Sequence, residues 1–209
     1  MPRLSAFGSP ALLLTLGLLS YLPLSLPAQE LGDRESRIVE AVADNQDRAV
    51  ALLQETVEIN SGTLNAPGQR AVYDAMAPRF EALGFEVEYV QPDVPQRGGH
   101  LVARRRGGQG KHLLLIGHMD TVFVEDSPFQ GWERLNDSIA RGPGVGDMKG
   151  GNVVIWSALE ALHREGTLEN TSIPVVLTGD EERPGRPLDE ARRALVEAGM
   201  EADIALGFE

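Results

Sequence analysis

Histidine and carboxylate side chains follow three short apolar runs of the sequence, each directly or closely after a glycine. His118 and Asp120 follow LLLIG, Glu181 and Glu182 follow VVLTG, and Glu209 follows IALG. Imidazole and carboxylate groups can bind divalent metal ions or transfer protons. Ligands of open α/β sheets bind at the carboxyl ends of the strands. We therefore expect the three runs to be neighbouring strands whose ends form one site.

A bound cation is one way to relieve the mutual repulsion of several carboxylates in one crevice. The chain of 209 residues contains no cysteine, so any metal ion must be held by His, Asp and Glu. That set of ligands suits zinc, with manganese or cobalt as alternatives. His118 and Asp120 are two residues apart, so on an extended backbone their side chains point to the same side. Asp120 can then orient the imidazole of His118.

A glycine-rich segment, GPGVGDMKGG at 142–151, carries one further carboxylate, Asp147. The segment does not match a phosphate-binding loop, because Lys149 is followed by glycine rather than by Ser or Thr. It does not match the dinucleotide fingerprint either, because Asp147 stands where the third glycine is required. A nucleotide-binding function is therefore disfavoured. The glycines instead allow a close backbone approach, which can place Asp147 deep in a site where its two oxygens bridge two metal ions.

The apolar pattern around these motifs predicts alternating helices and strands. Helices are expected over 34–59, 65–83, 152–163 and 188–198, and strands over 85–90, 100–106, 111–117, 172–179 and 202–209. Pro78 is expected to kink or break the second helix. The segment GGQG at 107–110 predicts a hairpin whose solvated tip contains the basic run 104–106. We predict an α/β fold with a mostly parallel sheet flanked by helices.

The composition and the N-terminus bear on partners and compartment. The chain has 31 acidic and 19 basic side chains, a net charge of −12, which is opposite to the balance expected of a nucleic-acid-binding protein. Residues 1–28 contain an early arginine, an apolar stretch around 11–19 and Ala28, the layout of a secretory signal peptide. An uncleaved membrane anchor is the competing interpretation. We expect a secreted or periplasmic protein, folded over 29–209, with no membrane contact beyond the signal peptide.

Four motifs in this order and spacing resemble the M20 family of zinc metallopeptidases, in particular its glutamate carboxypeptidase (carboxypeptidase G2-like) branch. They are GHMDTV (117–122), GPGVGDMKGG (142–151), GDEE (179–182) and ADIALGFE (202–209). The loop SGTLNAPG (61–68) also resembles an early substrate-side loop of that branch. The resemblance implies a zinc-exopeptidase-like catalytic domain, of which 29–209 is expected to be the N-terminal part. The family's dimerisation domain and C-terminal part, which carries a further metal-binding histidine, are absent from this sequence.

The resemblance also implies a cofactor of two Zn²⁺ ions and a role for each ligand. His118 and Glu209 would bind one ion, Glu182 would bind the other, and Asp147 would bridge the two. The peptide bond between Asp147 and Met148 is expected to be cis, as is typical of that family.

The implied reaction is hydrolysis of an amide or peptide bond next to a free carboxylate, of the carboxypeptidase, dipeptidase or aminoacylase type. Glu181 would be the general base and Asp120 would orient His118. Small peptides or N-acyl amino acids are the expected substrates, and the full-length form is expected to be a homodimer. The alternative is a truncated, non-catalytic metal- or peptide-binding derivative, and this chain alone is expected to be poorly active. Glu181 favours the enzyme, because a protein that only binds has no need of a base.

Overall fold

The structure is a computed structural model that describes residues 30–209. The expected signal peptide at 1–28 lies outside the described residues. Across 30–209, no helix is long and apolar enough to cross a membrane. All helices and strands named below belong to the unit formed by residues 31–209.

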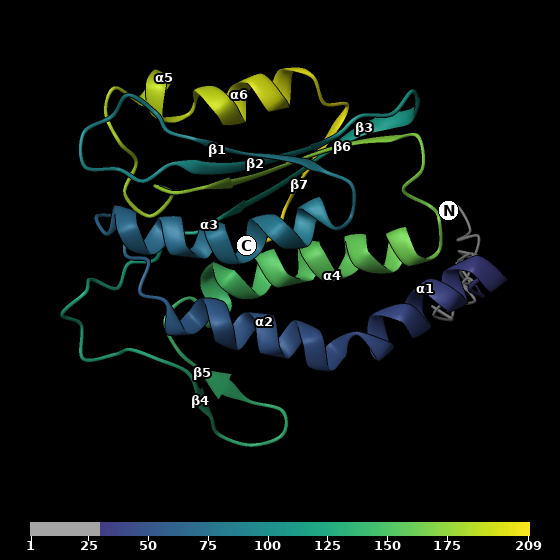
Figure 1. Cartoon of the computed structure of the whole chain (residues 1–209), viewed down its shortest axis with the longest axis horizontal. Coiled ribbons are helices and arrows are strands. Elements are labelled where there is room, and N and C mark those ends of the chain that lie inside the picture. The colour runs from purple at the N-terminus through teal and green to yellow at the C-terminus, as the bar shows by residue number, and fades with distance from the viewer. Residues whose placement is uncertain (1–29) are drawn as a thin grey trace, which may run out of the picture. The chain divides into compact units, whose positions relative to one another are not determined.

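A five-stranded sheet forms the centre of this unit (Figure 1). In spatial order the strands are β1 (Glu86–Val90), β2 (His100–Arg105), β6 (Thr171–Thr178), β3 (Gln109–His118) and β7 (Ile204–Gly207). β3 pairs in parallel with both β6 and β7, whereas β2 is antiparallel to both β1 and β6. Four strands therefore run in one direction and only β2 runs in the other. The prediction of a mostly parallel sheet flanked by helices is confirmed.

Helices cover both faces of the sheet (Figure 1). One face carries α3 (Ala66–Glu81) and α4 (Gly151–Arg164), and the other carries α5 (Leu188–Ala191) and α6 (Arg193–Met200). α1 (Asp33–Asp44) and α2 (Gln46–Glu58) form an outer layer against α4. The long connection between β3 and α4 contains a small antiparallel ribbon, β4 (Glu133–Arg134) and β5 (Ala140–Arg141), and then an irregular turn, η1 (Val145–Gly150).

The hydrophobic core lies in two layers, one on each side of the sheet. The layer under α3 and α4 is the larger, and the fully buried Phe80 of α3 packs edge-on against Phe85 there. The smaller layer, under α6, is formed around Val102, Leu114 and Val176. Apolar side chains on both faces of β2, β3 and β6 explain why these strands read as nearly continuous apolar runs.

The prediction of a hairpin at GGQG is wrong. β2 and β3 are not paired with each other, because β6 lies between them: Ala103 and Leu115 both pair with Val175. Residues 175–177 of β6 are completely buried, and a central position gives their backbone groups partners on both sides. The basic run is not a solvated tip either, since Arg105 donates hydrogen bonds to the carbonyl oxygens of Leu83 (2.8 Å) and Leu168 (3.0 Å).

Several helix boundaries also differ from the prediction. The helix expected over 34–59 is divided at Asn45 into α1 and α2, and the helix expected over 188–198 is divided at Arg192 into α5 and α6. α3 begins after Asn65, whose side chain accepts a hydrogen bond from the Gly68 amide (3.0 Å), as the sequence indicated. It is not broken at Pro78, which lies on the exposed side of its last turn.

Candidate metal centre

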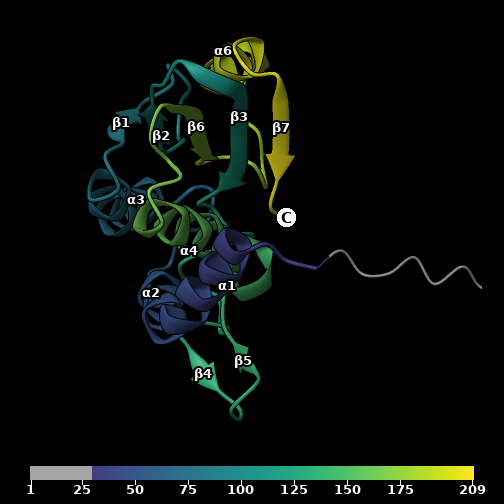
Figure 2. The ribbon, with the colours of Figure 1, turned by 90° about the vertical axis from the view of Figure 1, so that its right-hand side faces the viewer.

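The carboxyl ends of three parallel neighbours, β6, β3 and β7, meet at one edge of the sheet (Figure 2). β3 ends at His118, β6 is followed by Glu181 and Glu182, and β7 is followed by Glu209. The expected convergence of the three strand ends is therefore present in the fold. η1, which carries Asp147, approaches the same edge as it leads into α4.

Three of the four predicted metal ligands form a cluster. The ligand atoms of His118, Asp147 and Glu209 all lie within 4.8 Å of one another. The Nε2 atom of His118 is 3.0 Å from Oδ1 of Asp147 and 3.6 Å from Oε1 of Glu209. His118 is buried, whereas the three carboxylates around it, including Glu181 at 4.0 Å from Nε2, are exposed. An exposed ring of carboxylates around a buried imidazole is open to an ion arriving from solvent.

Glu182, the fourth predicted ligand, is not among the three clustered groups, but it is close enough to respond to them. Burial raises the pKa of the Glu182 carboxyl, and the charge of Asp147 raises it further. Burial and a hydrogen bond with Asp147 likewise raise the pKa of Glu209. Both shifts oppose the carboxylate form, so the site favours the binding of a positive ion.

The imidazole of His118 is oriented by Asp120. Its Nδ1 atom lies 3.0 Å from the main-chain oxygen of Asp120 and 3.4 Å from that residue's Oδ1. An Nδ1–H that donates to these oxygens leaves Nε2 as an acceptor facing two carboxylates, and only a proton or a metal ion can join such groups. Burial works to lower the pKa of His118, but the hydrogen bond and charge of Asp120, with the charge of Glu181, raise it to about 9.

The carboxylate of Asp120 also holds the segment that carries the predicted base. Asp120 is completely buried, and its Oδ1 accepts the amide of Glu181 (2.9 Å) while its Oδ2 accepts that of Glu182 (3.2 Å). The side chain of the preceding residue, Asp180, is buried and pairs with Arg192. Asp120 thus connects the imidazole at the end of β3 to the two glutamates that follow β6.

The turn that carries Asp147 is fixed by its neighbours. Asp147 has extended dihedral angles (φ −117°, ψ 102°), and its peptide bond with Met148 is cis, as the family resemblance implied. Gly144 has a φ of 78°, and a Cβ there would lie only 2.9 Å from the side chain of Thr121. Lys149, almost completely buried, donates hydrogen bonds to the carbonyl oxygens of Thr56 and Ile59 (both 2.8 Å).

The sequence did not predict two buried residues, Lys149 and Asn152, whose side chains hold the main chain around the site. The sequence around Lys149 indicates only that a nucleotide motif is absent there. Asn152, whose Nδ2 donates to the His118 carbonyl oxygen (2.6 Å), was not singled out at all. Both side chains act on main-chain carbonyl groups far away in sequence, and a single sequence carries no local signal of such contacts.

A hollow of about 210 Å³ adjoins the cluster on the side of α6. His118, Glu181 and Glu209 contribute to its wall, which is completed mainly by apolar residues and by Arg192. Its volume suits a small chemical group beside the candidate metal ligands.

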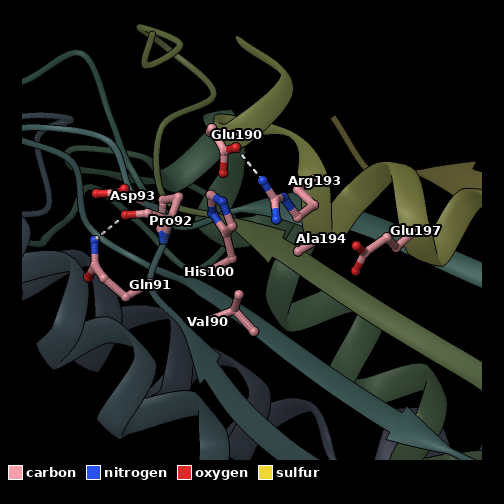
Figure 3. A pocket seen from close by; sticks show the side chains of 9 residues that line it. All are labelled: Val90, Gln91, Pro92, Asp93, His100, Glu190, Arg193, Ala194 and Glu197. Atoms are coloured by element: carbon pink, nitrogen blue, oxygen red, sulfur yellow. Dashed lines mark hydrogen bonds and ion pairs between the residues drawn. The ribbon is translucent and has the colours of Figure 1, made fainter. Parts of the chain in front are cut away.

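A second hollow of about 230 Å³ lies between the end of β1 and α5–α6, where Glu190 pairs with Arg193 (Figure 3). His100 lies in its wall, but Nδ1 of that ring accepts the Gly179 amide and Nε2 lies 3.0 Å from the Ala191 carbonyl oxygen. Because both ring nitrogens are used within the fold, this histidine has none left for a ligand.

Known proteins are similar to this chain in sequence and in fold. The family model described as "Peptidase family M20/M25/M40" matches residues 114–208 of this chain. Carboxypeptidase G2 of Pseudomonas sp. (strain RS-16) is 32% identical over 176 residues, which cover 84% of this chain and 42% of that protein. Succinyl-diaminopimelate desuccinylase of Methylobacterium radiotolerans is 32% identical over 161 residues, which cover 70% of this chain and 39% of that protein.

Two solved structures share the fold at lower sequence identity. Human carnosine dipeptidase 1 matches with a TM-score of 0.65 at 20% identity, over 82% of this chain and 40% of that chain. The M20 family metallo-carboxypeptidase Sso-CP2 of Sulfolobus solfataricus matches with a TM-score of 0.63 at 18% identity, over 78% and 37%. The chain therefore spans less than half the length of each of these four proteins.

Proposed function

The chain belongs to peptidase family M20/M25/M40, and we propose that it acts in the zinc-dependent hydrolysis of an amide or peptide bond next to a free carboxylate. The observation that carries the proposal is the cluster of His118 and Glu209, at the carboxyl ends of parallel strands, with Asp147 of the turn η1. Relatives named as a carboxypeptidase, a desuccinylase and a dipeptidase support a small peptide or an N-acyl amino acid as the substrate.

The residues present fit a zinc site. One imidazole nitrogen and several carboxylate oxygens are hard or borderline ligands, which suit Zn²⁺ and also Mn²⁺ or Co²⁺. We assign His118 and Glu209 to one ion and Glu182 to a second, with Asp147 between them. The raised pKa values of Glu182 and Glu209 support this assignment, because burial and the nearby charge of Asp147 raise them and a bound cation would favour the ionised carboxylates again.

Glu181 is the group we assign as general base. Its carboxylate is exposed, and its Oε2 lies 4.0 Å from Nε2 of His118, so it faces the cluster without being part of it. Its main chain is held by Asp120, which limits where the carboxylate can reach. Zinc, when bound, acts as a Lewis acid that polarises the scissile carbonyl and lowers the pKa of a water molecule. The Glu181 carboxylate accepts a proton from this water molecule and later passes it to the leaving amine.

The compartment and the assembly complete the proposal. The signal-peptide layout of residues 1–28 supports a secreted or periplasmic enzyme, which N-terminal sequencing of exported protein would test. We also propose that the full-length form is a homodimer. Light scattering, which measures the molar mass in solution, would test this.

A Glu181→Gln variant tests the function. The control is Glu197→Gln, which changes an exposed glutamate on α6 in the same way. Both variants are made in protein expressed from its natural reading frame. Bound zinc and turnover of an N-acyl amino acid are measured for both. We expect Glu181→Gln to lose about 10²–10⁴-fold in kcat while keeping its zinc, because the base is not a ligand. If it kept full activity, Glu181 would not be the base. If the unaltered protein bound zinc without turnover, the alternative of a non-catalytic metal-binding protein would be the better description.

A further inference from the structure

The hydroxyl group of Thr63 makes the shortest hydrogen bond to the carboxylate of Asp120. Its Oγ1 lies 2.6 Å from Oδ2 of Asp120, and both side chains are buried. Thr63 lies in the loop between α2 and α3, and 57 residues of sequence separate it from Asp120. None of the roles assigned above involves this residue.

The oxygens of Asp120 have partners in three separate segments of the chain. Oδ1 accepts the Glu181 amide at 2.9 Å and lies 3.4 Å from Nδ1 of His118. Oδ2 accepts the Thr63 hydroxyl and, less closely, the Glu182 amide at 3.2 Å. The carboxylate can turn about its own bond, and a turn would move both oxygens relative to His118 and Glu181. The Thr63 hydroxyl is the one side-chain donor that opposes such a turn, because the other donors shown belong to the main chain or to the imidazole that Asp120 must orient.

Thr63 itself is held firmly by main-chain contacts. Its amide donates to the Thr121 carbonyl oxygen (3.1 Å), and the Thr121 amide donates to that of Ser61 (3.0 Å). The buried side chain of Gln69 donates to the carbonyl oxygens of Gly62 (3.1 Å) and Thr63 (2.9 Å). These bonds fix the loop without the Thr63 hydroxyl. Removing the hydroxyl should therefore affect Asp120 more than it affects the fold.

We propose that Thr63 is a positioning residue, which acts through Asp120 to set both the imidazole of His118 and the main chain of Glu181. This inference rests on the proposed function, since it assumes that His118 binds metal and that Glu181 is the base. An O–H group that donates to a buried carboxylate makes a strong, charge-assisted hydrogen bond. Losing an outer partner of a metal-bound histidine typically costs 10–100-fold in metal affinity or activity.

The test compares three variants with the unaltered protein. Thr63→Val replaces the hydroxyl by a methyl group of similar size, and Thr63→Ser keeps the hydroxyl. Thr171→Val is the matched control, because it removes the hydrogen bond from the Thr171 hydroxyl to the Leu168 carbonyl oxygen (2.8 Å). Thr171 is the first residue of β6, at the end of the strand away from Glu181 and Glu182. The measurements are the zinc dissociation constant by competition with a chelator, kcat and KM for an N-acyl amino acid, and the thermal unfolding of metal-free protein.

We expect Thr63→Val to weaken zinc binding or lower kcat by about 10–100-fold, with a change in KM below about threefold. Thr63→Ser should restore both to within about threefold, and the melting temperature should fall no more than in Thr171→Val. Equal zinc affinity and kcat in Thr63→Val and Thr171→Val would overturn the inference, as would a Thr63→Ser variant as impaired as Thr63→Val. If Thr63→Val does not fold, Thr63→Ala gives the same comparison with no methyl group against Asp120. If the unaltered protein binds no zinc, the proposed function fails, and this inference fails with it.

Discussion

Replacing Lys149 by methionine should destabilise the protein, because this side chain joins the turn of Asp147 to the end of α2. The sequence contains only two lysines, and the other, Lys111, is 72% exposed, with its Nζ 3.9 Å from Asp203. Lys149 is 1% exposed, and its Nζ donates to the carbonyl oxygens of Thr56 and Ile59, both at 2.8 Å. Lys111→Met is therefore a matched control in which the same chemical change is made in solvent.

The size of the effect follows from these contacts. A hydrogen bond to a charged group contributes about 1.5–3 kcal/mol, and a buried acceptor left without a partner costs about 1–3 kcal/mol. Thr56 keeps the Ile59 amide as a second donor, so the loss falls mainly on the Ile59 carbonyl. Methionine avoids the burial of a charge, which offsets part of the loss. We expect Lys149→Met to lower the free energy of unfolding by about 2 kcal/mol at pH 7, or the melting temperature by about 4–8 °C. Lys111→Met should change it by less than about 0.5 kcal/mol.

The pH dependence gives this prediction a second, independent test. Burial lowers the pKa of Lys149 from 10.5 to about 7. Between these two values the unfolded chain holds the proton and the folded chain has released it, so the stability contributed by Lys149 rises with pH. The cost of Lys149→Met should therefore grow between pH 7 and pH 9, by on the order of 1 kcal/mol per pH unit. Urea unfolding of metal-free protein at both pH values measures it. The reasoning is refuted if Lys149→Met matches Lys111→Met at both, or if its cost falls as the pH rises.

Two further predictions concern the metal ions. Zinc at 100 times its dissociation constant should stabilise the protein by about 2.7 kcal/mol, which scanning calorimetry would show as a rise in melting temperature of about 5–11 °C. A chelator should reverse the rise and His118→Ala should abolish it, whereas His163→Ala, on the exposed side of α4, should retain it. Glu182→Gln should reduce the bound zinc from two ions per chain to one, as measured by elemental analysis, and Glu169→Gln should keep both. Two ions retained in Glu182→Gln would assign the second ion to other ligands.

The candidate site could be predicted because its signals are local. An apolar strand that reaches a glycine and then an acid or imidazole places its ligand at a strand end, whatever the order of the strands. His118 and Glu209 converge as this argument requires, and Asp147 joins them from the glycine-rich turn η1, although the three are separated by 29 and 62 residues of sequence. The α/β fold could be predicted for the same reason, since the strands of the central sheet and the helices that cover it are visible in their own apolar patterns.

The order of the strands could not be read in this way. GGQG is a plausible turn between β2 and β3, but the choice between a tight hairpin and an inserted third strand depends on a segment about 60 residues further along the chain. β6 must bury Val175, Val176 and Leu177 on both faces and also satisfy its backbone on both edges. The position between β2 and β3 meets both demands, and this competition between distant segments overrides the local turn signal.

The carboxylates that would touch metal or substrate are the least constrained part of this site. The side chains of Asp147, Glu181 and Glu209 are 63%, 52% and 68% exposed, so packing does little to fix their rotamers. What the fold controls is the backbone beneath them, and it does so with buried polar groups. Asp120 holds the amides of Glu181 and Glu182, Asn152 holds the His118 carbonyl, and Lys149 holds the turn of Asp147 against α2. Substitution of the exposed carboxylates should therefore change chemistry at little cost in stability, whereas substitution of the buried supports should change both.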